Sequence, residues 1–208
     1  MRLKNFWFSI FCISLILSCE KDKNPISSSS EVPMEIGSRW RYSIIDTAYD
    51  IYTHNFEVLY DTVDVKIIDT TVLPNGNIAK IWQYQFRDRI DSVFVAQSVD
   101  TLYFYWDTTY LFIKFAILFP LEVNKEWQIS FFDYKVFLTD TLFSPAGLFT
   151  DVFQIKEYPA RIGNSFGTNE YSIVPDIGIV RYKYGISVTI TQINHKSKWQ
   201  LLSYNVIN

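Results

Sequence analysis

Apolar and polar side chains alternate with a period of two residues through most of the chain. In the stretch 78–87, Trp82 and Tyr84 share one face, and the glutamines between and after them lie on the other. The stretches 180–184 and 186–190 alternate in the same way. Successive side chains of a β-strand point to opposite sides of the sheet. The pattern is therefore typical of strands with one buried face.

Short clusters of Pro, Gly and Asn separate these stretches, for example at 74–77 and 145–147, and such clusters mark turns. Few stretches have the spacing of an amphipathic helix. The best candidate, 110–119, is apolar on every side and reads equally well as a buried strand. The sequence therefore predicts an all-β fold: one long antiparallel meander of roughly ten to thirteen strands joined by short connections. We expect a strongly curved sheet or a partly closed barrel.

One segment occurs twice, at 33–43 and at 120–130, with a constant offset of 87 residues. Pro, Glu, Trp and Ser are identical in the two copies. Proline blocks pairing in a sheet, glycine or asparagine tolerates a positive φ, and tryptophan supplies a large apolar side chain. We interpret each copy as a structural corner that leads into a strand; the alternative is a pair of ligand sites built on the tryptophans. The structural residues are Pro33, Trp40, Pro120 and Trp127.

The repeat divides the chain into two pseudo-repeated halves, 33–119 and 120–208, and no linker separates them. We therefore expect a single β domain over 33–208, a length typical of one domain. Aromatic residues make up 18% of the chain, which is ample material for its core.

Three short motifs carry a resemblance to known proteins: Phe119-Pro120-Leu121 with Trp127, the segment 144–149, and the segment 175–182. Together they resemble uncharacterised bacterial secreted proteins and lipoprotein-like domains with curved antiparallel sheets. Asn124 replaces the glycine usual in that pattern. The resemblance implies a β fold and structural roles for Gly147 and Gly178. It implies no activity.

The N-terminus resembles a bacterial lipoprotein signal with a lipobox. Arg2 and Lys4 precede an apolar run at 6–17, and Cys19 follows Ser18 directly. The run is shorter than the about 18 apolar residues that a membrane-spanning helix needs. The resemblance implies that residues 1–18 are a signal peptide and that Cys19 carries acyl chains such as palmitate. The alternative is a plain signal peptide that leaves Cys19 as a free thiol.

Residues 19–32 then form a polar, serine-rich tether between the lipid and the domain. We expect the protein in the cell envelope, at the outer membrane. Its position on the periplasmic face or on the surface face of that membrane is not predicted. The only cysteines are Cys12 and Cys19. Cleavage removes the first and acylation occupies the second, so the domain has no disulfide and no thiolate for catalysis or metal binding.

Charge and histidine content narrow the chemistry further. The formal net charge is −3, whereas a nucleic-acid partner would require a basic patch. His54 and His195 are far apart in the sequence and lack the spacing of a zinc site. We predict no metal, no cofactor and no nucleic-acid partner.

No nucleophile motif is present, and the 22 acidic residues offer carboxylate pairs without selecting one. Enzymatic activity is therefore not favoured. The runs 102–106 and 110–119 are apolar on both strand faces. Either both faces are covered, or one face lines a groove for an apolar or sugar-like ligand. The candidate ligand-binding residues are Tyr103, Trp106 and Phe112.

Three functions remain as hypotheses. The first is a lipid-anchored envelope lipoprotein whose domain is a non-enzymatic binding or interaction module, with an envelope protein or an apolar ligand as partner. The second is a carrier of a lipid or other apolar ligand in the groove of the curved sheet. The third is a hydrolase with two carboxylates facing each other in a cleft.

Overall fold

The structure is a computed structural model, and it describes residues 32–50, 52–159, 165–188 and 193–207. The expected signal peptide, Cys19 and most of the expected tether lie outside these residues. Within them, no helix is long and apolar enough to cross a membrane.

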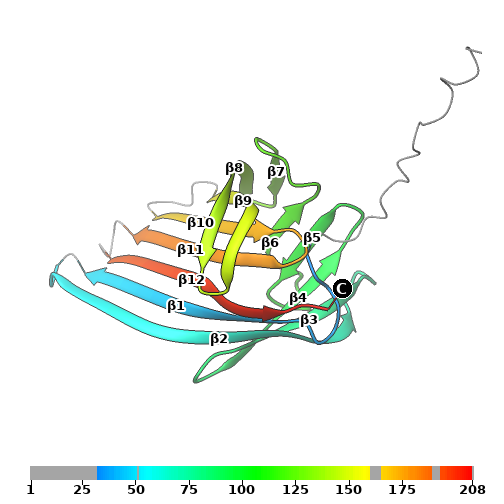
Figure 1. Ribbon diagram of the computed structural model, residues 1–208, viewed down its shortest axis with the longest axis horizontal. Helices are drawn as coiled ribbons and strands as arrows, with labels where there is room; N and C mark the ends of the chain where they lie inside the picture. The colour runs from blue at the N-terminus through cyan, green and yellow to red at the C-terminus, as the bar shows by residue number, and fades with distance from the viewer. Residues whose placement is uncertain (1–31, 51, 160–164, 189–192, 208) are drawn as a thin grey trace, which may run out of the picture.

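Twelve antiparallel strands form one continuous sheet (Figure 1). The spatial order is β6-β5-β4-β3-β2-β1-β12-β11-β10-β9-β8-β7, so two meanders of six strands meet where β1 pairs with β12. This confirms the predicted all-β antiparallel meander. The strands are β1 (Arg39–Asp50), β2 (Asn55–Val72), β3 (Ile78–Gln85), β4 (Ile90–Gln97), β5 (Thr101–Tyr105), β6 (Ile113–Leu118), β7 (Glu126–Ile129), β8 (Phe132–Ser144), β9 (Gly147–Pro159), β10 (Ser165–Val174), β11 (Gly178–Val188) and β12 (Ile193–Asn205).

The sheet curls until its two edge strands, β6 and β7, approach each other. The indole N–H of Trp127, on β7, donates a hydrogen bond of 3.2 Å to the carbonyl oxygen of Ala116, on β6. β6 and β7 are not neighbours in the hydrogen-bonded order of the sheet. The result is a nearly closed barrel in which a side chain bridges the seam.

The two copies of the repeated segment form corners of the same geometry. Gly37 and Asn124 both have positive φ, of 100° and 70°. The N–H of Gly37 donates to the carbonyl of Ile67 at 2.8 Å, and the N–H of Asn124 donates to the carbonyl of Val136 at 2.7 Å. Each corner thus fastens the start of one strand to the next strand along the chain, β2 in the first half and β8 in the second.

The other structural residues differ between the copies. Trp40 is 1% exposed and donates its indole N–H to the carbonyl of Ile177 at 2.6 Å, whereas Trp127 is half-buried. Pro33 is buried and Pro120 is exposed. The glycines of the two motifs both have positive φ, 137° at Gly147 and 99° at Gly178. A side chain at Gly178 would also place its Cβ 3.8 Å from the Trp40 indole nitrogen.

Aromatic rings line the concave face and form one connected group, which we call the aromatic belt. It runs from β1 through β3, β5 and β6 and then crosses the interior to β10, β11 and β12. One crossing is the contact of Phe115 with Tyr171, whose ring centroids are 4.2 Å apart and whose planes differ by 5°. Trp199, on β12, also contacts Tyr84 of β3 and Phe86. The belt consists of Trp40, Trp82, Phe104, Phe115, Tyr171, Tyr182 and Trp199.

A smaller apolar cluster lies on the convex face of β3 to β6. Its buried members are Leu73, Ala79, Ala96 and Tyr105. Tyr103 packs against it and stacks on Tyr105, with ring centroids 6.1 Å apart. The run 102–106 is therefore apolar on both faces because both faces are covered in this part of the sheet.

Truncation of Phe115 tests whether the belt holds the two walls together. Phe115→Ala removes a buried ring that contacts both Phe104 and Tyr171, and we expect it to lower the free energy of unfolding by about 3–5 kcal/mol. Phe112→Ala is the matched control. Phe112 is 64% exposed, so its truncation should change stability by less than about 0.5 kcal/mol. Urea unfolding of the two variants measures the difference, and equal midpoints would contradict the role of the belt.

Candidate functional site

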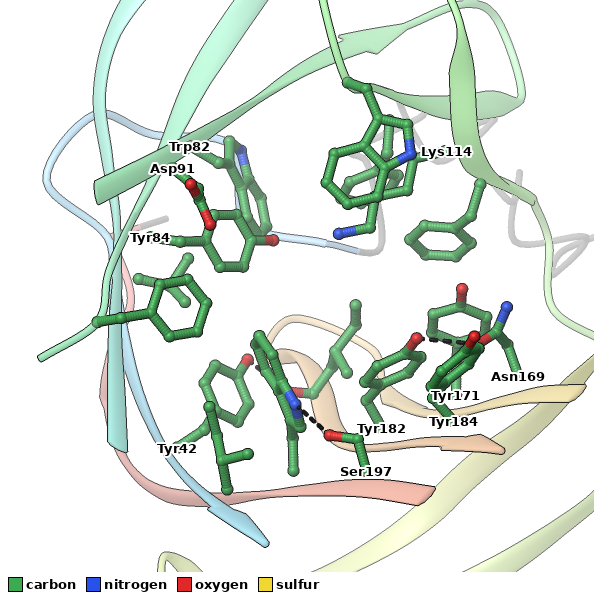
Figure 2. A pocket seen from close by; sticks show the side chains of 18 of the residues that line it. Tyr42, Trp82, Tyr84, Asp91, Lys114, Asn169, Tyr171, Tyr182, Tyr184 and Ser197 are labelled. Atoms are coloured by element: carbon green, nitrogen blue, oxygen red, sulfur yellow. Dashed lines mark hydrogen bonds between the residues drawn. The ribbon is translucent and has the colours of Figure 1, made fainter. Parts of the chain in front are cut away.

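The curved sheet encloses a cavity of about 660 Å³ on its concave side (Figure 2). Side chains from both halves of the chain line it, including the concave faces of β1, β3, β10, β11 and β12. Its volume lies within the range of about 300–1,000 Å³ that is usual for pockets that bind small molecules.

The strand register places the lining of one wall in two rows. The first, which we call the ring row, follows cross-strand neighbours from β1 to β10: Ile44, Trp199, Tyr182 and Tyr171. Three of its four members belong to the aromatic belt. This row gives the cavity an apolar surface that can bind hydrocarbon or a flat ring.

The second row, the polar row, is displaced from the ring row by two residues on each strand, on the side of the β1–β2 turn. It crosses five strands and consists of Asp46, Ser197, Tyr184, Asn169 and Glu157. All five residues line the cavity. Apolar and polar side chains thus form separate bands on one wall, which suits a ligand with an apolar body and a polar end.

Glu157 is the one acidic side chain that is buried among the described residues, with 3% of its surface exposed. Its carboxylate accepts hydrogen bonds from the amide of Asn169 at 2.5 Å and from the hydroxyl of Tyr171 at 3.3 Å. Burial raises the pKa of this carboxyl, and its hydrogen bonds and the charge of Lys114 act against that rise. The carboxylate is therefore held in place by neighbours that satisfy both of its oxygens.

Lys114 faces Glu157 from the opposite half of the chain, and a β-bulge sets its position. Phe104 pairs with Phe115 and Tyr105 pairs with Ile113, so Lys114 is an extra residue on β6. A bulge of this kind redirects a side chain. Both Lys114 and the adjacent Phe115 consequently line the cavity.

The ammonium group of Lys114 rests on aromatic faces. Its Nζ lies 3.9 Å from the ring centroid of Trp106 and 5.7 Å from that of Tyr84, within the range of cation–π interactions. Burial lowers the pKa of Lys114 from its usual 10.5 to about 8, although Asp91 and Glu157 act in the opposite direction. Figure 2 shows the amine extending into the space beside Tyr84.

Two buried polar atoms at the cavity lack a hydrogen-bond partner among the described residues. The Oδ1 atom of Asp46 and the Nε1 atom of Trp82 are buried, and neither has a hydrogen-bond partner among the described residues. Both residues line the cavity. Buried polar atoms are nearly always hydrogen-bonded, so a ligand that supplies a donor or an acceptor would find partners here.

Of the three ligand-binding residues predicted from the sequence, Trp106 lines the cavity. Tyr103 lies in the convex cluster, and Phe112 is exposed and does not line the cavity. Sequence reasoning missed Lys114 and Glu157. The available signal was a charge inside an apolar stretch: Lys114 interrupts 110–119, and Glu157 follows Ile155 on the buried face of its strand.

Within the described ranges, no three His, Cys, Asp or Glu side chains lie close enough together to hold a metal ion. His195 lines the cavity and contacts Tyr184. His54 lies in the exposed β1–β2 turn, 3.1 Å from the hydroxyl of Tyr49. The two histidines are thus on separate parts of the sheet.

No protein-family model matches the chain, and no curated protein sequence matches it. The chain is similar to several solved structures, among them the following two. One, of a candidate lipoprotein from Parabacteroides distasonis ATCC 8503, has a TM-score of 0.46 and 12% identity over 84% of this chain and 98% of that one. The other, of a DUF1329 family protein from Desulfovibrio piger ATCC 29098, has a TM-score of 0.25 and 7% identity over 79% of this chain and 84% of that one.

The lowered pKa of Lys114 predicts a pH dependence of stability. Between about pH 8 and pH 10.5 the unfolded chain binds more protons at this lysine than the folded chain does. The contribution of Lys114 to the free energy of unfolding should therefore increase as pH rises through this window. Lys114→Met should remove this contribution, so that the difference in stability between variant and wild type changes with pH.

Urea unfolding of both proteins at a series of pH values measures that difference. Lys198→Met is the control, because Lys198 is exposed on the convex face of β12. Its difference from wild type should stay constant with pH. A constant difference for Lys114→Met as well would show that the amine is not buried.

Proposed function

We propose that this chain is an envelope lipoprotein that binds a lipid or another apolar small molecule in the cavity of its curved sheet. Cys19, acylated and exposed as the first residue when residues 1–18 are removed, holds it at the outer membrane, and residues 19–32 are the tether. The observation that carries the binding function is the cavity of about 660 Å³, whose wall presents the ring row beside the polar row.

The composition of the lining supports binding more than catalysis. Binding pockets for small molecules are mostly apolar, with a few polar groups that orient the ligand, and the ring row with the polar row has this character. A carboxylate-pair hydrolase would need two acids facing each other across the cleft. Glu157 is buried alone among the described acids, and its oxygens accept bonds from Asn169 and Tyr171.

A role in protein interaction is the second candidate, and one observation favours it. The connection between β5 and β6 carries three exposed aromatic residues: Trp106, Tyr110 and Phe112 are 56%, 75% and 64% exposed. Aromatic side chains are enriched in interfaces. Because Trp106 also lines the cavity, a partner that contacts this connection would meet the ligand site.

A variant that fills the cavity tests the binding function. Gly167 lines the cavity, and a Cβ there would be 3.7 Å from its nearest neighbour, an ordinary contact. Gly167→Trp should weaken the binding of a neutral apolar probe such as N-phenylnaphthylamine by about tenfold or more. Fluorescence titration of the purified protein measures the affinity.

The matched control is Thr168→Trp, which places the same ring on the adjacent, exposed residue of β10. Adjacent residues of a strand face opposite sides, so this variant should bind the probe as wild type does. Equal binding by all three proteins, or no binding by the wild type, would contradict a ligand site in the cavity.

The anchor is tested separately by fractionation. Cys19→Ala should prevent acylation and processing, and the variant should lack the lipid that mass spectrometry detects on the mature N-terminus of the wild type. Cys12→Ala changes the other cysteine of the leader and should still yield a lipidated, membrane-bound protein. Recovery of a wild-type protein that is unmodified and soluble would exclude the lipoprotein assignment.

A further inference from the structure

Lys114 is a cationic group of the cavity whose hydrogen-bond donors the described residues leave unused. An ammonium group carries three N–H donors and no acceptor. In the part of the chain that the structure describes, Nζ contacts the faces of Trp106 and Tyr84 and makes no hydrogen bond or ion pair. Burial of a charge without a hydrogen-bonded partner is unfavourable.

The nearby carboxylates already have partners of their own. Asp91 forms an ion pair with Arg89, with 3.0 Å between Oδ2 and Nε. Both oxygens of Glu157 accept hydrogen bonds, from Asn169 and Tyr171. These acids favour the charged form of Lys114 from a distance, but neither lies within ion-pair distance of its amine. An acceptor for the Lys114 donors must therefore come from outside the described side chains.

We propose that the cavity binds a single-chain amphiphile with an anionic head group, whose oxygens accept hydrogen bonds from Lys114 while its hydrocarbon chain lies along the ring row. This inference rests on the proposed ligand-binding function and names the class of ligand. A charge-assisted hydrogen bond between an ammonium and an oxyanion is roughly twice as strong as a neutral one, so the head group would account for much of the selectivity.

A cationic ligand fits less well, although the cavity also contains acidic side chains. Quaternary and primary ammonium groups are recognised on the faces of aromatic rings. The faces of Trp106 and Tyr84 are already occupied by the ammonium of Lys114 itself. A second cation at this position would be repelled by the first.

Isothermal titration with matched twelve-carbon ligands tests the inference on the purified protein. Dodecanoate, dodecyl phosphate, dodecanol and dodecyltrimethylammonium share one chain and differ only in the head group. We expect one or both anions to bind about tenfold or more tightly than dodecanol, and the cation to bind no more tightly than dodecanol. The ratio of the two anions identifies the head group as a carboxylate or a phosphate.

Lys114→Met keeps an unbranched side chain that is one atom shorter and removes its charge. It should reduce the preference for the anion over dodecanol to less than about threefold. Lys114→Arg should keep the preference. Lys198→Met, which removes a charge from the exposed convex face of β12, should leave binding of the anion unchanged.

The outcomes separate this inference from the function on which it rests. If dodecanol binds and neither anion binds more tightly, the cavity is a ligand site and the role of Lys114 is wrong. The role is also wrong if Lys198→Met weakens anion binding as much as Lys114→Met does. If none of the four ligands binds the wild type, the proposed binding function itself fails.

Discussion

The contact between Phe115 and Tyr171 is the interaction on which the rest of the structure depends. Hydrogen bonds join β6 to β5 and β7 to β8, but β6 and β7 are not paired with each other. Backbone pairing alone would therefore leave an open, curved sheet. The stacked rings of Phe115 and Tyr171 connect β6 to β10 across the interior, and Trp127 bridges the seam beside them. Side-chain contacts thus close the sheet, whereas in a complete barrel backbone hydrogen bonds join the first and last strands.

The aromatic rings close the sheet at one height along the strands, and the cavity lies next to these rings. Strands β1, β2, β10, β11 and β12 extend side by side towards the β1–β2 turn (Figure 1). On this side of the aromatic belt the side chains of both halves border the cavity of about 660 Å³. The strand register places the polar row, from Asp46 to Glu157, at this height. Polar side chains are tolerated here because they line the cavity and are not packed in the hydrophobic core.

Much of the fold could be predicted from the sequence, because alternation along strands and turn residues are local signals. The corners at Gly37 and Asn124 could be predicted as well, since the repeat and the need for positive φ are both visible in the sequence. The site could not. Tyr103 and Trp106 belong to one apolar run, yet one lies in the convex cluster and the other lines the cavity. The bulge that turns Lys114 inward is a property of pairing between β5 and β6, and no local pattern reports it.

Comparison of the two halves shows where the chemistry of the site originates. Ile67 and Val136 accept the equivalent corner hydrogen bonds, and they pair with Trp82 on β3 and with Ile155 on β9. Two residues further along these strands, Tyr84 and Glu157 therefore occupy equivalent positions, and both line the cavity. The corners keep the same geometry because each must fasten a strand. The walls have no such requirement, so one half presents a ring to the amine of Lys114 where the other presents a buried carboxylate. The polarity of the cavity thus arises at the positions where the halves differ, which is where selection for a ligand could act without disturbing the sheet.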